Sequence, residues 1–234
     1  MKTPIRAKVF SQTNPIAAYG FNEGTGTTTA DSSGSGKIGT LTNGPAWTAG
    51  KYGNGISFDG LDDVVILPSD NPRQQMTIMA WVNTNSRSGE AVRGHIFAIK
   101  DRTDQKPFIT LRNTGTDGEL RFEQGRLTGT NSVTIPYWNS QVNSVPNSQW
   151  VHVAVTYDGS SSSASDTQFY INGVPVSATL HGSLAGTFIT DSFEWTIGND
   201  LATKQTFDGV IDEVRVYDRI LTESEIQNDM NTPL

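Results

Sequence analysis

The chain of 234 residues contains no cysteine, only three histidines and no long apolar run. Without cysteine it has no disulfide bonds and no thiolate metal site. No segment approaches the roughly 18 consecutive apolar residues that a membrane-spanning helix needs. The first twelve residues, MKTPIRAKVFSQ, carry positive charge but lack the apolar segment of a signal peptide.

Positive charge is also scarce. The 17 Lys and Arg residues face 24 Asp and Glu residues, and the formal net charge is −7. Nucleic acids and anionic membranes select basic surfaces, so we expect neither nucleic-acid binding nor membrane insertion. The acidic balance is compatible with cations or neutral sugars, and equally with a solubilising surface. A composition rich in Thr, Asn, Ser and Gly predicts an extracellular or cell-surface location.

The apolar residues that are present follow the pattern of β-strands. Val151, Val153 and Val155 alternate with other residues, and residues 76–82 (MTIMAWV) are typical of a central strand buried on both faces. Asn172-Gly173 between two short apolar runs indicates a hairpin. We therefore predict an all-β, two-sheet antiparallel sandwich over residues 16–234, after a lead-in arm or linker over residues 1–15.

The C-terminal segment, residues 207–230, combines a strand with a helix. Period-two alternation over residues 210–217 predicts a strand. Thr222 and Glu225 have the spacing of a capping box, and Leu221, Ile226 and Met230 give the following helix one apolar stripe. We expect this short helix to dock over the end of the β-fold.

The same segment carries a family resemblance. Residues 209–226 follow the string G-x-I-D-E-V-R-V-Y-D-R-x-L-T-x-x-E-I. This string closely resembles the closing motif of bacterial laminin G-like domains, which belong to the concanavalin A-like jelly-roll superfamily. Matching pieces precede it in the family's order: residues 18–24, 31–34, 58–65, 76–82, 150–159, 169–173 and 197–198. The resemblance implies a jelly-roll sandwich, a fold that hosts lectins, sugar-binding modules, glucanases, lyases and adhesion domains.

Asp59, Asp62 and Asp63 form the first candidate metal site. Carboxylates clustered on a tight loop suit calcium, which takes about six to eight oxygen ligands. In the resembled fold, residues near Asp212 join this loop. The alternative is that Asp59 caps a turn while the other two carboxylates are solvated.

A second acidic group comprises Asp101 and Asp104 on one loop, with Asn199 and Asp200 on another. Resemblance to pentraxins and laminin G domains implies a calcium site at a sheet rim in these positions. Nearby cationic side chains would weaken such a site by repelling the ion; they are Lys100, Arg102, Lys106 and Lys204. The alternative is salt bridges between the two loops.

The candidate ligand-binding residues lie in the long polar segment 124–149. Sugar-binding modules stack pyranose rings on exposed aromatic side chains. Tyr137 and Trp138 are surrounded by polar residues, so we expect them on an exposed loop, with Asn139 and Gln141 bonding to sugar hydroxyls. The alternative is that this loop folds its aromatic side chains back on the sandwich. Trp81, by contrast, falls inside a predicted strand and is expected to be buried.

The sequence lacks known catalytic patterns of this fold. Glucanases use an E-x-D-x-x-E strand, whereas here Arg121 separates Glu119 from Glu123. We therefore predict a non-catalytic binding module for carbohydrate, one of several domains of a larger extracellular bacterial protein, with calcium as a candidate stabilising ion. A structural or adhesion module that contacts protein is the alternative, and a polysaccharide-active enzyme is the third interpretation.

Overall fold

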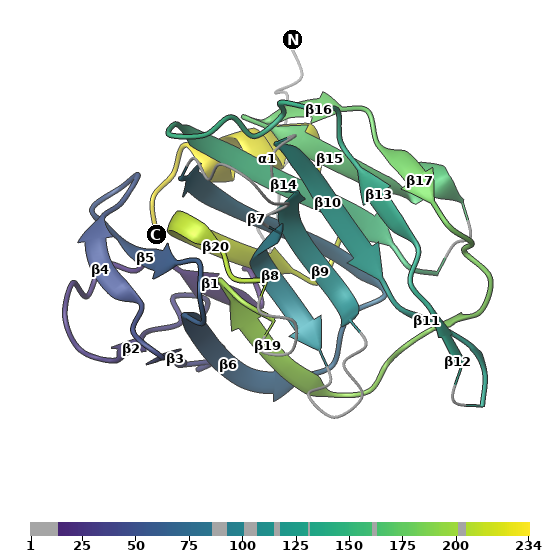
Figure 1. Ribbon diagram of the computed structural model, residues 1–234, viewed down its shortest axis with the longest axis horizontal. Helices are drawn as coiled ribbons and strands as arrows, with labels where there is room; N and C mark the ends of the chain where they lie inside the picture. The colour runs from purple at the N-terminus through teal and green to yellow at the C-terminus, as the bar shows by residue number, and fades with distance from the viewer. Residues whose placement is uncertain are drawn as a thin grey trace, which may run out of the picture.

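The computed structural model describes residues 14–85, 93–100, 107–114, 118–130, 132–160, 163–200 and 205–234. Within these ranges the chain folds into two large antiparallel sheets that pack face to face, with one helix near the C-terminus (Figure 1). The predicted all-β jelly-roll sandwich is confirmed. No helix in the described ranges is long and apolar enough to cross a membrane.

The first sheet has eight strands in the order β16-β15-β14-β7-β20-β5-β4, with β1 paired beside β20. We call it the helix-side sheet. Its strands are β1 (Ala17–Tyr19), β4 (Ala46–Ala49), β5 (Asn54–Asp59), β7 (Gln75–Thr84), β14 (Trp150–Asp158), β15 (Thr167–Ile171), β16 (Val174–Val176) and β20 (Asp208–Tyr217).

The second sheet has nine strands in the order β17-β13-β10-β9-β8-β19-β6-β3-β2. We call it the open-side sheet. Its strands are β2 (Thr28–Thr29), β3 (Gly39–Thr42), β6 (Val64–Asp70), β8 (Arg93–Lys100), β9 (Pro107–Thr114), β10 (Glu119–Gln124), β13 (Tyr137–Asn139), β17 (Thr179–His181) and β19 (Phe193–Ile197). A small third sheet joins β11 (Arg126–Gly129), β12 (Ser132–Thr134) and β18 (Thr187–Phe188), and a short 3-10 helix spans Ala164–Asp166.

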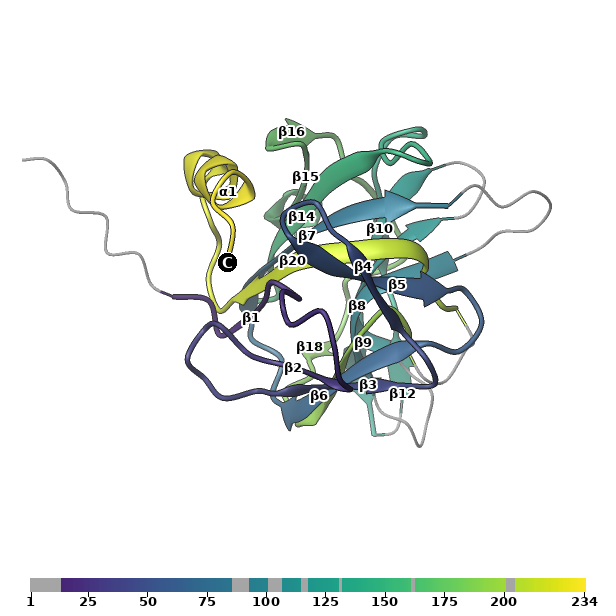
Figure 2. The same ribbon diagram turned by 90° about the vertical axis from the view of Figure 1, so that its left-hand side faces the viewer.

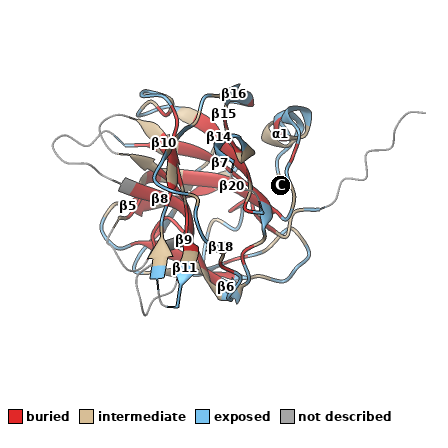
Figure 3. Ribbon diagram, turned by 90° about the vertical axis from the view of Figure 1, so that its right-hand side faces the viewer, coloured by how far each residue is buried: buried red, intermediate tan, exposed pale blue. Residues whose placement is uncertain are grey.

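The core lies between the two large sheets, where the described strands are mostly buried (Figure 3). As the sequence predicted, β7 and β14 are central strands of the helix-side sheet. Trp195 contributes from the open-side sheet and is fully buried, with its ring edge against Phe97 at 5.5 Å between centroids. Trp81 is buried as expected, at 7% exposure.

Helix α1 (Glu223–Met230) begins at the predicted capping box. The Thr222 hydroxyl accepts the amide N–H of Glu225, whose carboxylate accepts the amide N–H of Thr222 in return. The prediction that this helix docks over the end of the sandwich is wrong. The helix packs instead on the outer face of the helix-side sheet (Figure 2). The reason is an apolar outer patch on that sheet, formed by Met79, Ala154, Tyr170 and Tyr217, which buries Leu221 and Ile226.

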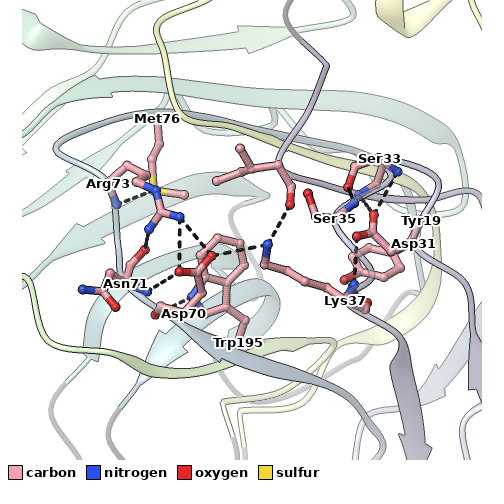
Figure 4. Close-up of polar contacts among 12 residues, drawn as sticks. Tyr19, Asp31, Ser33, Ser35, Lys37, Asp70, Asn71, Arg73, Met76 and Trp195 are labelled. Atoms are coloured by element: carbon pink, nitrogen blue, oxygen red, sulfur yellow. Dashed lines mark hydrogen bonds and ion pairs between the residues drawn. The ribbon is translucent and has the colours of Figure 1, made fainter.

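The N-terminal part of the described chain is fixed by a chain of ion pairs and hydrogen bonds (Figure 4). The Asp31 carboxylate accepts the amide N–H of Lys37, and the Lys37 ammonium bonds to the Ile16 carbonyl and pairs with Asp70 at 3.4 Å. Asp70 also pairs with Arg73 at 3.0 Å. Burial opposes ionisation, but backbone hydrogen bonds and the neighbouring cations lower the pKa of Asp70. These contacts tie the segment between β2 and β3 to Ile16 and to the end of β6.

Candidate functional site

The outer faces of the two large sheets differ. Helix α1 covers the apolar outer face of the helix-side sheet. The outer face of the open-side sheet carries polar side chains, because period-two alternation sends every second residue of each strand away from the core. In β10, for example, Leu120 and Phe122 are buried in the core, while Glu119, Arg121 and Glu123 are only partly buried on the opposite face.

The strand order brings polar residues from four strands together on this outer face. We define them as the polar face: Thr110, Arg112 and Thr114 from β9, Glu119, Arg121 and Glu123 from β10, Tyr137 and Asn139 from β13, and Thr179 and His181 from β17. The residues of β17, the edge strand, are the most exposed, whereas Arg112 is only 3% exposed.

Tyr137 stands between two planar side chains of the polar face. The Arg121 guanidinium lies over its ring at 4.1 Å from the centroid. The His181 ring stacks on it at 4.8 Å between centroids, with an interplanar angle of 12°. Since β10 and β17 flank β13 on opposite sides, the two groups cover opposite faces of the Tyr137 ring. This arrangement leaves the ring edge and the hydroxyl for contact with a ligand, rather than a ring face.

Asn139 links a cation to a carboxylate. Its side-chain oxygen accepts a hydrogen bond from Arg121 Nε at 2.7 Å, and its amide nitrogen donates to the Glu119 carboxylate at 2.9 Å. Glu119 also accepts from the Thr114 hydroxyl at 3.2 Å. With both ends of its amide engaged, Asn139 fixes the positions of the Arg121 and Glu119 side chains.

Arg112 and Glu123 form the inner part of the polar face. Nε and Nη2 of Arg112 both donate to the Glu123 carboxylate, which also accepts from the Thr110 hydroxyl at 3.0 Å. Burial opposes ionisation of Glu123, but the Arg112 guanidinium and these hydrogen bonds lower its pKa. Nη1 of Arg112 is buried and has no hydrogen-bond partner among the described residues. The pair therefore keeps both charges in a site largely shielded from solvent.

Of the predicted ligand-binding residues, the structure places Tyr137 and Asn139 on the polar face. The expected exposed loop around Trp138 is wrong, because residues 137–139 form strand β13. Trp138 points into the core, where it is 2% exposed and donates its indole N–H to the Ala164 carbonyl at 3.1 Å. A buried indole has no face to offer to a sugar. Gln141 lies beyond the strand and is exposed.

The acidic loop of the first metal prediction does form a cluster. Carboxylate oxygens of Asp59, Asp62 and Asp63 all lie within 4.8 Å of one another. Asp63 is nearly buried and accepts the amide N–H of Asp59 at 2.9 Å. Burial, together with the neighbouring charges of Asp59 and Asp62, raises the pKa of Asp63.

Asp212 does not join this cluster. It is fully buried on β20, where one of its oxygens accepts the amide N–H groups of Lys51 and Tyr52 at 2.9 and 3.0 Å. Its second oxygen accepts the amide N–H of Glu213. Asp59 instead pairs with Asp208 at the other end of the β5–β20 ladder. The expected role of Asp212 is therefore corrected from metal ligand to fixing the loop before β5.

The residues of the second predicted metal site are arranged differently from the prediction. Asp101 and Asp104 lie outside the described residues. Asp200 is buried and accepts a hydrogen bond from the Lys100 ammonium at 2.7 Å, with His95 Nε2 at 3.8 Å. Asn199 is also buried, and its backbone carbonyl accepts from the Thr196 hydroxyl. The salt-bridge alternative thus holds for Asp200, whose carboxylate is engaged by a lysine rather than directed at an ion.

Sequence reasoning missed Arg121, Glu119 and His181 as members of one site. A signal was available for the first two, because the alternating string Glu-Leu-Arg-Phe-Glu places three charged residues on one strand face. His181 could not be found this way, since it reaches the site through the pairing of β13 with β17.

Comparison with known proteins agrees with the fold. Residues 58–227 match a laminin G-type family model described as the concanavalin A-like lectin/glucanase superfamily. No curated protein sequence matches the chain.

Three solved structures are similar in fold. Domain 4 of AbnA, an extracellular GH43 arabinanase from Geobacillus stearothermophilus solved with arabinotriose, has a TM-score of 0.64 at 21% identity, over 93% of this chain and 98% of that domain. The binding domain of Paraclostridial mosquitocidal protein 1 has a TM-score of 0.69 at 15% identity, over 93% of this chain and 52% of that one. A Trypanosoma rangeli sialidase has a TM-score of 0.62 at 17% identity, over 93% of this chain and 33% of that one.

The family model matches residues 58–227 and so covers well over half of the chain. The chain therefore belongs to the concanavalin A-like lectin/glucanase superfamily, with a laminin G-type domain as its match.

Proposed function

We propose that this chain is a non-catalytic module that binds carbohydrate on the polar face of its open-side sheet. The observation that carries the proposal is the cross-linked group of Arg121, Asn139, Glu119 and Tyr137, on an outer sheet face that no helix among the described residues covers. Sugar hydroxyls bind best to donors and acceptors that are held at fixed spacing. The hydrogen bonds within this group already fix its side chains, so these side chains need no further ordering when a sugar binds. The similarity to an arabinanase domain solved with arabinotriose supports this assignment.

The sugar would bind through hydrogen bonds rather than by stacking on Tyr137, because Arg121 and His181 already cover both faces of the Tyr137 ring. The ring fixes the Arg121 guanidinium by a cation–π contact. Arg121 and Asn139 would then direct their polar atoms to sugar hydroxyls, and the Tyr137 hydroxyl would add one more group.

The carboxylates of the polar face support binding rather than hydrolysis. A glycosidase needs one carboxyl with a raised pKa beside a second carboxylate, at roughly 5–10 Å. Glu123 has the opposite property, since its pKa is lowered beside Arg112. Glu119 lies four residues away on the same strand, about 13 Å along the backbone. Turnover of a polysaccharide by the purified chain would replace the present proposal with the enzyme interpretation.

The test is glycan-array screening followed by titration of the best ligand, with Arg121→Gln and Asn139→Ala compared with the unchanged chain. We expect each substitution to weaken binding by about tenfold or more, since each removes a group that contacts the ligand and fixes its neighbours. Arg219→Gln is the matched control, because Arg219 pairs with Glu225 on the helix side. This control should bind like the unchanged chain.

Two results would contradict the proposal. If binding survives in Arg121→Gln and Asn139→Ala while both remain folded, the site lies elsewhere. If no glycan binds and the chain instead captures a protein partner, the adhesion interpretation takes its place. The toxin binding domains among the structural neighbours make that second result a specific alternative.

We also propose that the module works outside the cell as part of a larger protein. Its structural neighbours include domains of an extracellular arabinanase and of toxins, which supports this location. The composition, rich in Thr, Ser, Asn and Gly with little Lys, supports it as well.

Calcium is proposed as a stabilising ion at Asp59, Asp62 and Asp63. Three carboxylates that converge on a turn supply hard oxygen donors, which calcium prefers. Burial is the main cause of the raised pKa of Asp63, but repulsion from Asp59 and Asp62 adds to it, and a cation at the cluster would relieve that repulsion as a proton does.

A further inference from the structure

The charges of the polar face are balanced within the face itself. It contains two guanidinium groups, on Arg112 and Arg121, and two carboxylates, on Glu119 and Glu123. Arg112 pairs directly with Glu123. Arg121 is joined to Glu119 through the Asn139 amide, which contacts both side chains. Each cation is thus matched by a carboxylate on the same or the adjacent strand.

The neighbouring part of the same sheet repeats this balance. Beside the polar face, the buried Lys100 ammonium pairs with Asp200 at 2.7 Å. The whole chain has a formal net charge of −7. An anionic ligand would therefore meet a repulsive overall field and a site whose cations are already compensated.

We infer that the ligand is a neutral sugar rather than a uronate or sulfated one, an inference that rests on the proposed function of the polar face. Recognition of an acidic glycan uses arginine or lysine groups whose charge is available, since charge-assisted contacts to carboxylate or sulfate supply both affinity and steering. A balanced face presents alternating donors and acceptors instead, which suit hydroxyl groups because each hydroxyl both donates and accepts.

Glu119 is one of the two carboxylates that balance the charge of the polar face. It accepts from Asn139 and Thr114, and a glutamine in its place could accept through its amide oxygen. Glu119→Gln thus removes one negative charge while preserving an acceptor, and the polar face then carries two guanidinium groups and one carboxylate. Asp218→Asn is the matched control, because it changes the net charge equally at an exposed residue beyond β20 of the helix-side sheet.

The experiment measures binding of the full chain to neutral probes (linear arabinan, β-glucan and mannan) and to an acidic probe (polygalacturonate) at pH 8, where an ordinary histidine is neutral. Each probe is titrated at about 20 mM and about 300 mM salt, since screening acts on charged ligands. We expect at least one neutral probe to bind, with less than about a twofold change between the salt concentrations. Polygalacturonate should not bind the unchanged chain or Asp218→Asn, and should bind Glu119→Gln in a salt-sensitive manner.

The possible outcomes distinguish failure of the neutral-sugar inference from failure of the proposed carbohydrate site. Polygalacturonate binding by the unchanged chain, weakened by salt and lost in Arg121→Gln, would overturn the neutral class while supporting the site. Failure of Glu119→Gln to gain acidic binding, with neutral binding still dependent on Arg121, would show that charge is not what excludes acidic sugars. Absence of binding to every probe, or binding that ignores Arg121→Gln, would overturn the proposed function itself.

Discussion

The Glu213 carboxylate accepts the amide N–H of Leu234, with its two oxygens at 3.0 and 3.2 Å. Glu213 is a non-glycine residue at φ 55, at the irregularity where β20 changes register against β7. It also accepts a hydrogen bond from Arg215, which donates to the Thr232 carbonyl. The closing motif of the sequence therefore fixes the segment after helix α1 through the charged side chains of a buried bulge.

Replacing Glu213 with alanine should be strongly destabilising. Arg215 is buried, and removal of one partner of a buried ion pair costs about 3–5 kcal/mol. Chemical denaturation checks this, with Asp218→Ala as an exposed control in the same strand-to-helix segment. A loss below about 1 kcal/mol would mean that Arg215 finds other partners at little cost.

Trp138→Ala should act on stability before it acts on binding. Truncating a fully buried tryptophan removes transfer free energy and leaves a cavity, at about 3–5 kcal/mol. The measurement is urea denaturation, with Trp47→Ala as the control because Trp47 is only partly buried on edge strand β4. Unchanged stability, together with lost glycan binding, would mean that Trp138 is exposed and contacts the ligand, contrary to the structure.

Tyr137 should position Arg121 rather than stack on the ligand. Tyr137→Phe keeps the ring between Arg121 and His181, whereas Tyr137→Leu removes the cation–π contact, which is worth about 0.5–2 kcal/mol. We expect the leucine variant to lose several-fold more affinity for the glycan than the phenylalanine variant does. Equal losses in the two variants would indicate that the hydroxyl, and not the ring, is the part that matters.

Titration of the buried Asp212 carboxyl should give the stability of the protein an unusual dependence on pH. Burial raises its pKa to about 7, above the range of an aspartate in an unfolded chain. Between these two pKa values Asp212 binds more protons in the folded state than in the unfolded state, so its contribution to the free energy of unfolding falls as pH rises from about 4 to about 7. Asp212→Asn should remove this contribution, so the free energy of unfolding of the variant should rise more with pH than that of the unchanged chain, even though the substitution itself costs stability at every pH. Asp63 and Glu213, whose pKa values burial also raises, act in the same direction as Asp212 and remain in both proteins.

Denaturation midpoints at half-unit steps of pH would check this prediction for both proteins. Asp70 and Glu123 act in the opposite direction, because their pKa values are lowered, and the stability they contribute is lost only as the solution becomes more acidic. The buried histidines act in this direction too, because burial lowers the pKa of His95 and lowers that of His152 to about 3, so both raise the free energy of unfolding as pH rises toward about 6.5. Identical slopes between about pH 4 and about pH 7 in the unchanged chain and in Asp212→Asn would therefore count against a raised pKa at Asp212.

Calcium should raise the melting temperature through the loop of Asp59, Asp62 and Asp63. A ligand that binds only the folded state adds about 2.7 kcal/mol at a hundredfold excess over its Kd. Melting curves with calcium, with magnesium and with chelator test this, and Asp62→Asn should remove the calcium effect. Identical curves in all three conditions would eliminate calcium at this loop. A shift that persists in Asp62→Asn but vanishes in Asp200→Asn would move the ion to the rim.

The sequence by itself determined the class of fold and the closing helix, because both depend on local signals. Period-two alternation in β14 and β20 and the short apolar run in β7 predict strands wherever they are placed, and Thr222 with Glu225 predicts a helix start from spacing alone. These patterns survive in the structure because local preference and tertiary packing agree at each of them.

Only the tertiary structure decided which side chains meet. Tyr137 and Trp138 are neighbours in the chain but point to opposite sides of β13, and the neighbouring strands decided which of them entered the core. Asp212 was separated from Asp59 by the register of β20 against β5, which no local pattern encodes. His181 joined Arg121 across an intervening strand for the same reason: strand order is set by contacts between residues far apart in the sequence.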